Sequence, residues 1–167
     1  MLFNTLQDLY IDSLNDLYTS EMRIAEHLAA VIKADSASTV TEEVSQMYNE
    51  SSNSRALLEK FFKDQHLKPL GRKNTVINAL IQKSIEHLQF CTNPELKGSA
   101  LVASLQCIMH YQIACYGSAA TYAKTLGLEN FSEALHTIVQ EKKRFDVALS
   151  EIAEKGAHGA APNTRAA

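Results

Sequence analysis

Residues 10–31 of the chain read YIDSLNDLYTSEMRIAEHLAAV. Side chains that can face a core recur in this stretch at alternating steps of four and three residues, which is typical of a helix packed in a bundle. The members of this stripe are Tyr10, Leu14, Leu17, Glu21, Ile24, Leu28 and Val31. The stretch therefore predicts a long amphipathic helix over residues 5–34, with one carboxylate among its apolar core residues.

A similar periodicity recurs in four further stretches, and it predicts helices over residues 40–65, 75–91, 94–126 and 131–155. Helix-capping and turn residues separate these stretches. The predicted boundary residues are Asn4 and Gln7, Thr39 and Glu42, Asn93 and Pro94, Gly127, and Asn130 and Glu133. The order is a helical hairpin, a long connection with a short extra helix, and a second hairpin. We therefore predict an all-α fold, a ferritin-like four-helix bundle in which a long crossover joins two αα-hairpins.

The bulk composition agrees with one globular domain. The chain has 167 residues, 46% of them hydrophobic, and only 3 prolines and 6 glycines. We expect the bundle to occupy residues 1–156 and the small, polar tail 157–167 to be disordered. The net charge of −3 gives no electrostatic support for nucleic-acid binding, and no apolar stretch is long enough for a membrane span. Because the start lacks a basic region like that of a signal peptide, we expect a cytoplasmic protein.

Each predicted long helix carries one polar residue near the middle of its stripe. These residues are Glu21, Glu50, Gln112 and Glu141. The interval from Glu21 to Glu50 equals the interval from Gln112 to Glu141, 29 residues in each case. Since each interval straddles a turn almost symmetrically, we expect all four side chains to lie at one height in the core. The sequence therefore predicts a buried polar layer.

Buried carboxylates need compensation, because each loses several kcal/mol of solvation, as an order of magnitude. Di-iron and di-manganese bundles supply it with metal ions held by glutamates and by Glu-x-x-His motifs. Here Asn53 stands three residues after Glu50, and Arg144 three residues after Glu141, where such motifs have histidine. Three solutions remain open. Arg144 pairs internally with Glu141 or Glu50, an iron or manganese ion binds Glu21, Glu50 and Glu141, or water fills the layer.

Residues 109–117 read MHYQIACYG. This segment, in the helix predicted over residues 94–126, resembles the corresponding helix of the YciF-like family of bacterial ferritin-like stress proteins, where Glu-x-x-Glu precedes Ile-Ala-x-Tyr. The resemblance extends over nearly the whole bundle and implies a stress-related role, a homodimer and a di-metal site. Met109 and Gln112 replace both family glutamates of this segment, so the resemblance places them in a degenerate form of that site.

Other candidate residues have simpler interpretations. We expect the six histidines at the surface or at helix edges, the three cysteines as buried reduced thiols, and residues 142–144 on a solvated face from which Arg144 alone turns inward. The leading hypothesis is a non-enzymatic, stress-associated protein with a degenerate di-metal site and no full cofactor. It would have a structural role or bind a protein partner. The alternative is a carboxylate-bound iron or manganese protein that handles peroxide, oxygen or iron.

Overall fold

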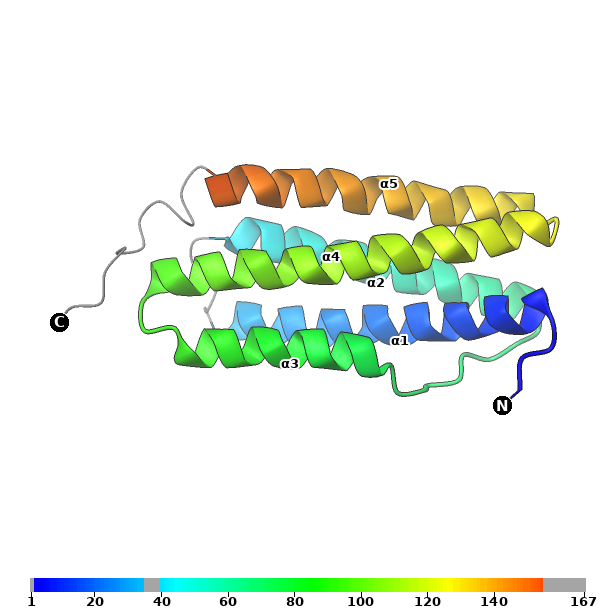
Figure 1. Ribbon diagram of the computed structural model, residues 1–167, viewed down its shortest axis with the longest axis horizontal. Coiled ribbons are helices and arrows are strands. Elements are labelled where there is room, and N and C mark those ends of the chain that lie inside the picture. Colours follow the sequence, from blue (N-terminus) through cyan, green and yellow to red (C-terminus); the bar gives the residue numbers. More distant parts are fainter. Residues whose placement is uncertain (1, 35–39, 155–167) are drawn as a thin grey trace.

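The computed structural model describes residues 2–34 and 40–154, and within them every regular element is helical (Figure 1). The helices are α1 (Leu6–Lys33), α2 (Thr41–Asp64), α3 (Thr75–Phe90), α4 (Pro94–Thr125) and α5 (Glu129–Ile152). The prediction of a four-helix bundle with a fifth, short helix in its crossover is thus confirmed. The tail predicted at 157–167 and the predicted cap Thr39 lie outside the described residues.

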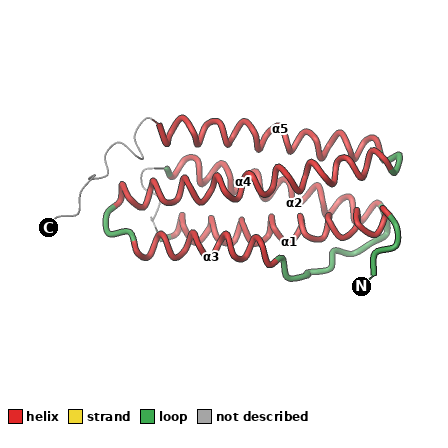
Figure 2. Tube along the Cα trace, viewed as in Figure 1, coloured by secondary structure: helices red, strands yellow, loops and turns green. Residues whose placement is uncertain are grey.

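The two hairpins form the body of the bundle. Helix α1 packs mainly against α2, and α4 mainly against α5, whereas α2 and α5 contact each other least. The short helix α3 lies outside the bundle against α4 and α1 (Figure 2). Consequently one side of the bundle is covered by α3, and the opposite side, between α2 and α5, is the more open one.

Capping chemistry explains where the helices begin. The Thr5 hydroxyl accepts a hydrogen bond from the backbone N–H of Asp8, and the Asp8 carboxylate accepts one from the N–H of Thr5. This capping box lies one residue after the Asn4 and Gln7 pair that we predicted. Asn93 caps α4 as predicted, since its side chain accepts the N–H of Leu96.

The turn between α4 and α5 depends on a glycine. Gly127 has φ 75°, a left-handed conformation that side chains disfavour. The N–H of Gly127 donates to Lys124, and that of Leu128 donates to Ala123, which satisfies the last carbonyls of α4. The chain re-enters a helix at once, and so α5 begins at Glu129 rather than at the predicted residue 131.

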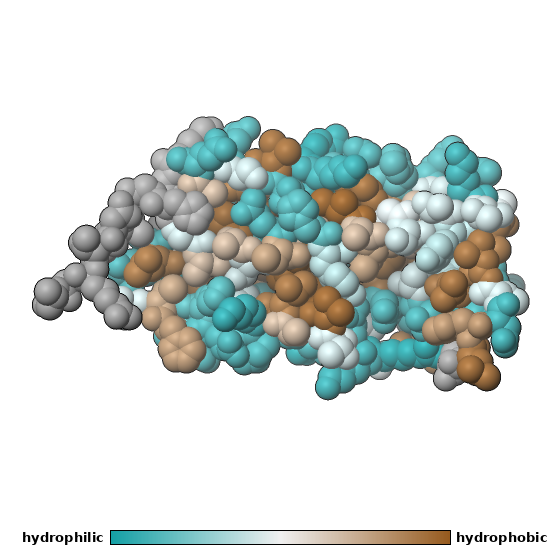
Figure 3. Space-filling view, viewed as in Figure 1, coloured by the Kyte–Doolittle hydropathy of each residue, from teal (hydrophilic) through white to brown (hydrophobic). Residues whose placement is uncertain are grey.

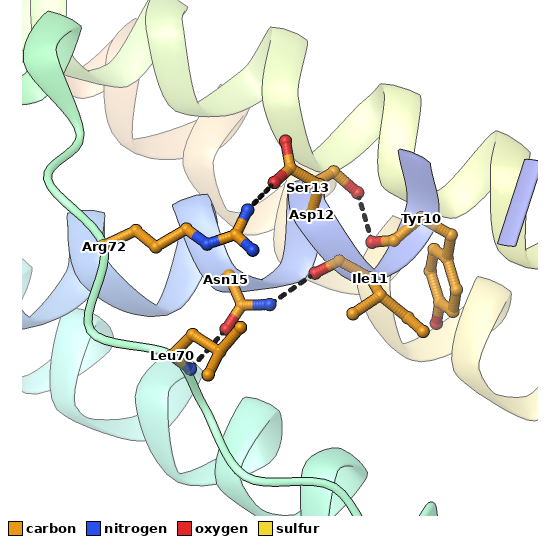
Figure 4. A network of polar contacts seen from close by, with 7 residues as sticks. All are labelled: Tyr10, Ile11, Asp12, Ser13, Asn15, Leu70 and Arg72. Carbon is orange, nitrogen blue, oxygen red and sulfur yellow. Dashed lines mark hydrogen bonds and ion pairs between the residues drawn. The ribbon is translucent and has the colours of Figure 1, made fainter. Parts of the chain in front are cut away.

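Polar contacts hold the crossover against α1 (Figure 4). Asn15 donates to the carbonyl of Ile11 at 2.8 Å and accepts the backbone N–H of Leu70 at 2.6 Å. Beside it, Arg72 pairs with Asp12. The Asn15 side chain therefore provides an acceptor for the backbone N–H of Leu70, which lies in the crossover outside any helix.

The core consists of two hydrophobic clusters, one in each half of the bundle. One is built around Ile24, Leu28, Met47, Leu105 and Phe145, and the other around Leu14, Leu17, Phe61, Ala119 and Leu135. On the outer face that shows α3 and α4, apolar side chains form separate patches among hydrophilic ones (Figure 3). Within the described ranges, each helix is too short or too polar to cross a bilayer.

Candidate functional site

A polar layer separates the two hydrophobic clusters. Along each long helix, polar residues stand between the residues of one cluster and those of the other. The central polar layer, as we define it, comprises Glu21 on α1, Ser51 and Ser54 on α2, Gln112 on α4 and Lys142 on α5. All five side chains are buried, and Glu21 and Gln112 have no exposed area at all. The predicted layer exists, but its members differ from those that we expected.

Lys142 is the hub of this layer. Its Nζ lies 3.0 Å from Glu21 Oε1 and donates a hydrogen bond of 2.9 Å to Gln112 Oε1. The Lys142 side chain is only 2% exposed. A buried ammonium is normally too costly to keep without a partner. Here a carboxylate and an amide oxygen surround it, and three helices are tied together through one nitrogen atom.

Tyr116 closes the layer on the side of the second cluster. Its hydroxyl donates to Glu21 Oε1 at 2.7 Å, and the centre of its ring lies 5.2 Å from Lys142 Nζ. Burial raises the pKa of Tyr116 well above its usual value, and the nearby Glu21 carboxylate raises it further. The Ser54 hydroxyl acts in the opposite direction by hydrogen bonding to Tyr116. Tyr116 therefore keeps its proton and acts as a hydrogen-bond donor to the carboxylate.

Three polar atoms of the layer lack a hydrogen-bond partner among the described residues. Within the described part of the chain, no residue hydrogen-bonds Glu21 Oε2 or Gln112 Nε2, although both atoms are fully buried. The same holds for the hydroxyl of Ser51. Buried polar atoms of this kind are uncommon and usually have a physical or chemical explanation. Lys142 Nζ therefore has two oxygen acceptors, whereas these three polar atoms of the layer have no partner.

The structure separates the residues that we predicted to meet. Glu21 and Gln112 are in the layer, and Met109 is buried next to it in the first hydrophobic cluster. Glu50 is only half-buried and accepts a hydrogen bond from Gln46. The assignment of this carboxylate to the core layer is therefore wrong.

The other predicted members of the layer lie outside the core. Asn53, Glu141 and Arg144 are exposed. Together with Glu50 they line an open groove of about 400 Å³ between α2 and α5. The placement of Glu141 and Arg144 in the core was wrong because α5 presents Lys142 to the interior, and that of Asn53 was wrong because α2 presents Ser51 and Ser54. One residue corresponds to about 100° of rotation around a helix, and that is enough to move Glu141 to the surface.

The sequence reasoning did not predict Lys142 in the layer. We had assigned residues 142–144 to a solvated face. A usable signal was present, however, because Ile138, Lys142, Phe145 and Leu149 follow strict steps of four, three and four residues. Glu141 breaks that alternation. A strict reading of the helical period would have placed the lysine in the core.

The layer does not fit a two-metal centre. Among the residues that the structure describes, no three histidine, cysteine, aspartate or glutamate side chains lie close enough to share an ion. Lys142 brings a fixed positive charge to the carboxylate that a metal would use. A cation in this position would be repelled and would find only one carboxylate in the layer.

Two smaller expectations also need correction. His27 is buried rather than at an edge, and its Nε2 lies 3.0 Å from the hydroxyl of Ser84 on α3. Burial lowers the pKa of His27 below its usual value. The cysteines are free thiols, but Cys107 is exposed and Cys91 and Cys115 are only half-buried.

The fold and the layer define a class: an all-helical bundle protein with an internal ion pair at the centre of its core. Comparison with known proteins places the chain more closely. Residues 5–161 match the model of the family described as domain of unknown function DUF892. The chain belongs to this family, which is the YciF-like family.

Individual relatives agree with this assignment. The chain is 26% identical to protein YciF of Escherichia coli K12 over 164 residues, which cover 98% of the chain and 99% of that protein. The crystal structure of the E. coli stress protein YciF matches with a TM-score of 0.86 at 25% identity, covering 94% of this chain and 99% of that one. YcfI from Rhodopseudomonas palustris, described as a candidate structural protein, matches with a TM-score of 0.82 at 27% identity, covering 88% and 94%.

Proposed function

We propose that this chain is a stress-associated structural protein in which Lys142 takes the place of metal ions at the centre of the bundle. The observation that carries the proposal is the position of Lys142 Nζ, 3.0 Å from Glu21 and 2.9 Å from Gln112. One ammonium balances one carboxylate, so the central polar layer needs no added cation. The protein is then a scaffold whose core charge is internal, and the di-metal site of the resemblance is degenerate.

The chemistry of the ligands supports this reading. Iron and manganese sites in bundles use several carboxylates and histidines that converge on the ion. In the described part of this chain, the layer holds a single carboxylate, Glu21, and its remaining members are an amide, an ammonium and hydroxyls. Glu50 and Glu141, the other predicted ligands, lie on the groove between α2 and α5. A catalytic metal centre therefore has too few ligands here.

The relatives support the biological half of the proposal. One is described as a stress protein and another as a candidate structural protein. A homodimer, a cytoplasmic setting and a protein partner complete the proposal, and they come from the resemblance and from the composition. The alternative function, an iron or manganese protein that handles peroxide or oxygen, requires the ions that Lys142 excludes.

Metal analysis of the purified chain tests the proposal. We expect iron and manganese far below one ion per chain in protein prepared without chelator, and an unfolding midpoint that a chelator leaves unchanged. Near-stoichiometric metal that disappears in a Glu21→Ala/Glu50→Ala variant would overturn the proposal in favour of the alternative. The variant Glu141→Ala is a useful control, because it removes only a carboxylate that the fold places at the surface.

A further inference from the structure

Three buried functional groups of the central polar layer lie close enough to react with one another. Lys142 supplies a primary amine, Gln112 a carboxamide and Glu21 a carboxylate. The amine nitrogen lies 2.9 Å from the oxygen of the carboxamide and 3.0 Å from the nearer carboxylate oxygen. All three side chains are 2% exposed or less. This is a nucleophile, an acyl group and a proton acceptor within contact distance in a buried layer.

We propose that Lys142 and Gln112 join in an internal isopeptide bond that links α5 to α4, with Glu21 as the proton acceptor. The inference rests on the proposed function, because a metal ion in the layer would occupy Glu21 and displace the amine. The ion pair is then the state of the layer before the reaction, and the covalent bond replaces it. In the product, a covalent bond would join the two helices of the α4–α5 hairpin near the middle of the bundle.

The reaction balances without an oxidant or a cofactor. Lys142 transfers one ammonium proton to Glu21 and becomes a free amine. Its Nζ attacks the Cδ carbon of Gln112, and an N–C bond forms. A second proton passes from the attacking nitrogen, through the carboxyl group of Glu21, to the Nε2 of Gln112. The bond between Cδ and Nε2 then breaks, ammonia leaves, and Glu21 remains as a neutral carboxylic acid.

The surroundings favour the products over the reactants. An ammonium and a carboxylate in an apolar core each carry a desolvation penalty of several kcal/mol, as an order of magnitude. The products are a neutral amide and a neutral acid, so the reaction removes both buried charges. Ammonia escapes to the solvent and is diluted, which opposes the reverse reaction. The hydrogen bond from Tyr116 to Glu21 Oε1 survives, since a carboxylic acid still offers an acceptor oxygen.

The hydrogen bonding also suits the departure of the amide nitrogen. Gln112 Nε2 donates no hydrogen bond to the described residues, so no protein contact must break when it leaves. Glu21 Oε2 likewise lacks a partner and is free to carry the proton. Because Nζ already contacts Gln112 Oε1, rotation about the Cγ–Cδ bond, which leaves Cδ in place, turns the face of the carboxamide toward the nitrogen without moving a helix.

Burial supplies the remaining advantages. Reactive groups fixed side by side can reach effective concentrations of roughly 10⁵ M or more. Water is the usual competitor for an activated acyl group, and burial of the three side chains limits its access from bulk solvent. Lys143, the next residue, is exposed and therefore lacks these buried surroundings. The reaction is thus expected at Lys142 alone.

The intact mass of the purified, denatured full-length chain tests the inference. We expect a mass lower than that of the sequence by one ammonia, and a branched peptide joining Lys142 to Gln112 after proteolysis. Glu21→Gln keeps both reacting side chains but removes the proton acceptor, so that variant should have its full mass. Lys143→Met should still lose ammonia, because it changes only the exposed neighbour.

Each other outcome overturns the inference. A wild-type chain of full mass rules it out whatever the variants do, and loss of ammonia that maps to another residue does the same. Loss of one water instead of ammonia would place the bond between Lys142 and Glu21 rather than at Gln112. Metal analysis of the same sample separates the two proposals. A full mass without bound metal would contradict only the isopeptide bond. A full mass with bound metal would contradict the proposed function as well.

Discussion

Replacing Lys142 by methionine removes the ammonium from the core and keeps most of the side-chain length. Methionine fills space of similar shape, so the loss of packing should be small, at most about 1.5 kcal/mol. The charge is what changes. Glu21 would be left without its cation in a site where its side chain has no exposed area, and Gln112 Oε1 would lose its donor.

The expected loss follows from these contacts. Removing one partner of a buried ion pair costs about 3–5 kcal/mol, because an uncompensated charge remains. An unpaired buried acceptor such as Gln112 Oε1 costs about 1–3 kcal/mol on its own, and the two terms overlap. We therefore expect Lys142→Met to lower the free energy of unfolding by about 3–5 kcal/mol, a large share of the stability of a small domain. An isopeptide bond at Lys142 would increase the loss.

Urea unfolding followed by far-UV circular dichroism measures this difference. Lys143→Met is the matched control, and because Lys143 is exposed its effect should stay within about 0.5 kcal/mol. Adding Glu21→Gln to Lys142→Met removes the stranded charge and should recover about 2 kcal/mol or more. Equal, small effects of the two lysine substitutions would rule out a buried ion pair at Lys142, since they would place both side chains in solvent.

Two further predictions concern the packing around the crossover. Burial lowers the pKa of His27 below its ordinary value of 6.5. The unfolded chain therefore binds a proton at His27 more readily than the folded chain does. The free energy of unfolding should consequently fall as the pH drops through 6.5. His27→Gln should reduce this fall, whereas His136→Gln, at an exposed position, should not. Identical pH profiles for the wild type and the two variants would count against a buried His27. Asn15→Leu leaves the N–H of Leu70 without its acceptor and should cost about 1–3 kcal/mol in the same urea experiment; no loss would mean that the crossover is held by other contacts.

The architecture followed from the sequence because the signals for it are long and repeated. The stripe of residues 10–31 keeps its period over six steps, and its members form the buried face of α1 in the structure. Asn93 and Pro94 mark the start of α4 by local chemistry alone. Such signals depend on neighbours in the chain, so they can be read without knowledge of the tertiary contacts.

The composition of the layer was harder to predict, because α2 permits two stripes. One stripe contains Glu43, Glu50 and Leu57, and the other contains Val44, Ser51 and Leu58. Both share Met47, Ser54 and Phe61 and both have helical spacing. The fold buries the second stripe, which is the less charged one. Equal intervals between glutamates and the family pattern favoured the first, but desolvation of two more carboxylates decides against it.

Lys142 was not predicted in the core because Glu141 was assigned to that position of α5. A run of three basic residues usually faces solvent, and a lysine at a core position is rare because its charge must be compensated. That compensation comes from α1 and α4, which lie 121 and 30 residues away in the chain at Glu21 and Gln112. Only the assembled bundle shows that these acceptors meet the amine. The helical period of α5 therefore indicates which residues face the core, but it does not show which partners compensate the charge of Lys142.

The reactivity of the lysine side chains in the native protein reports directly on whether Lys142 lies in the core. Brief labelling with an amine-specific acylating reagent, followed by digestion and mass spectrometry, compares Lys142 with its neighbour Lys143. We predict that Lys143 is labelled readily while Lys142 stays unmodified in the folded chain, because only 2% of the Lys142 side chain is exposed. Labelling of both lysines at similar rates would contradict the burial of Lys142, since its side chain would then lie in solvent.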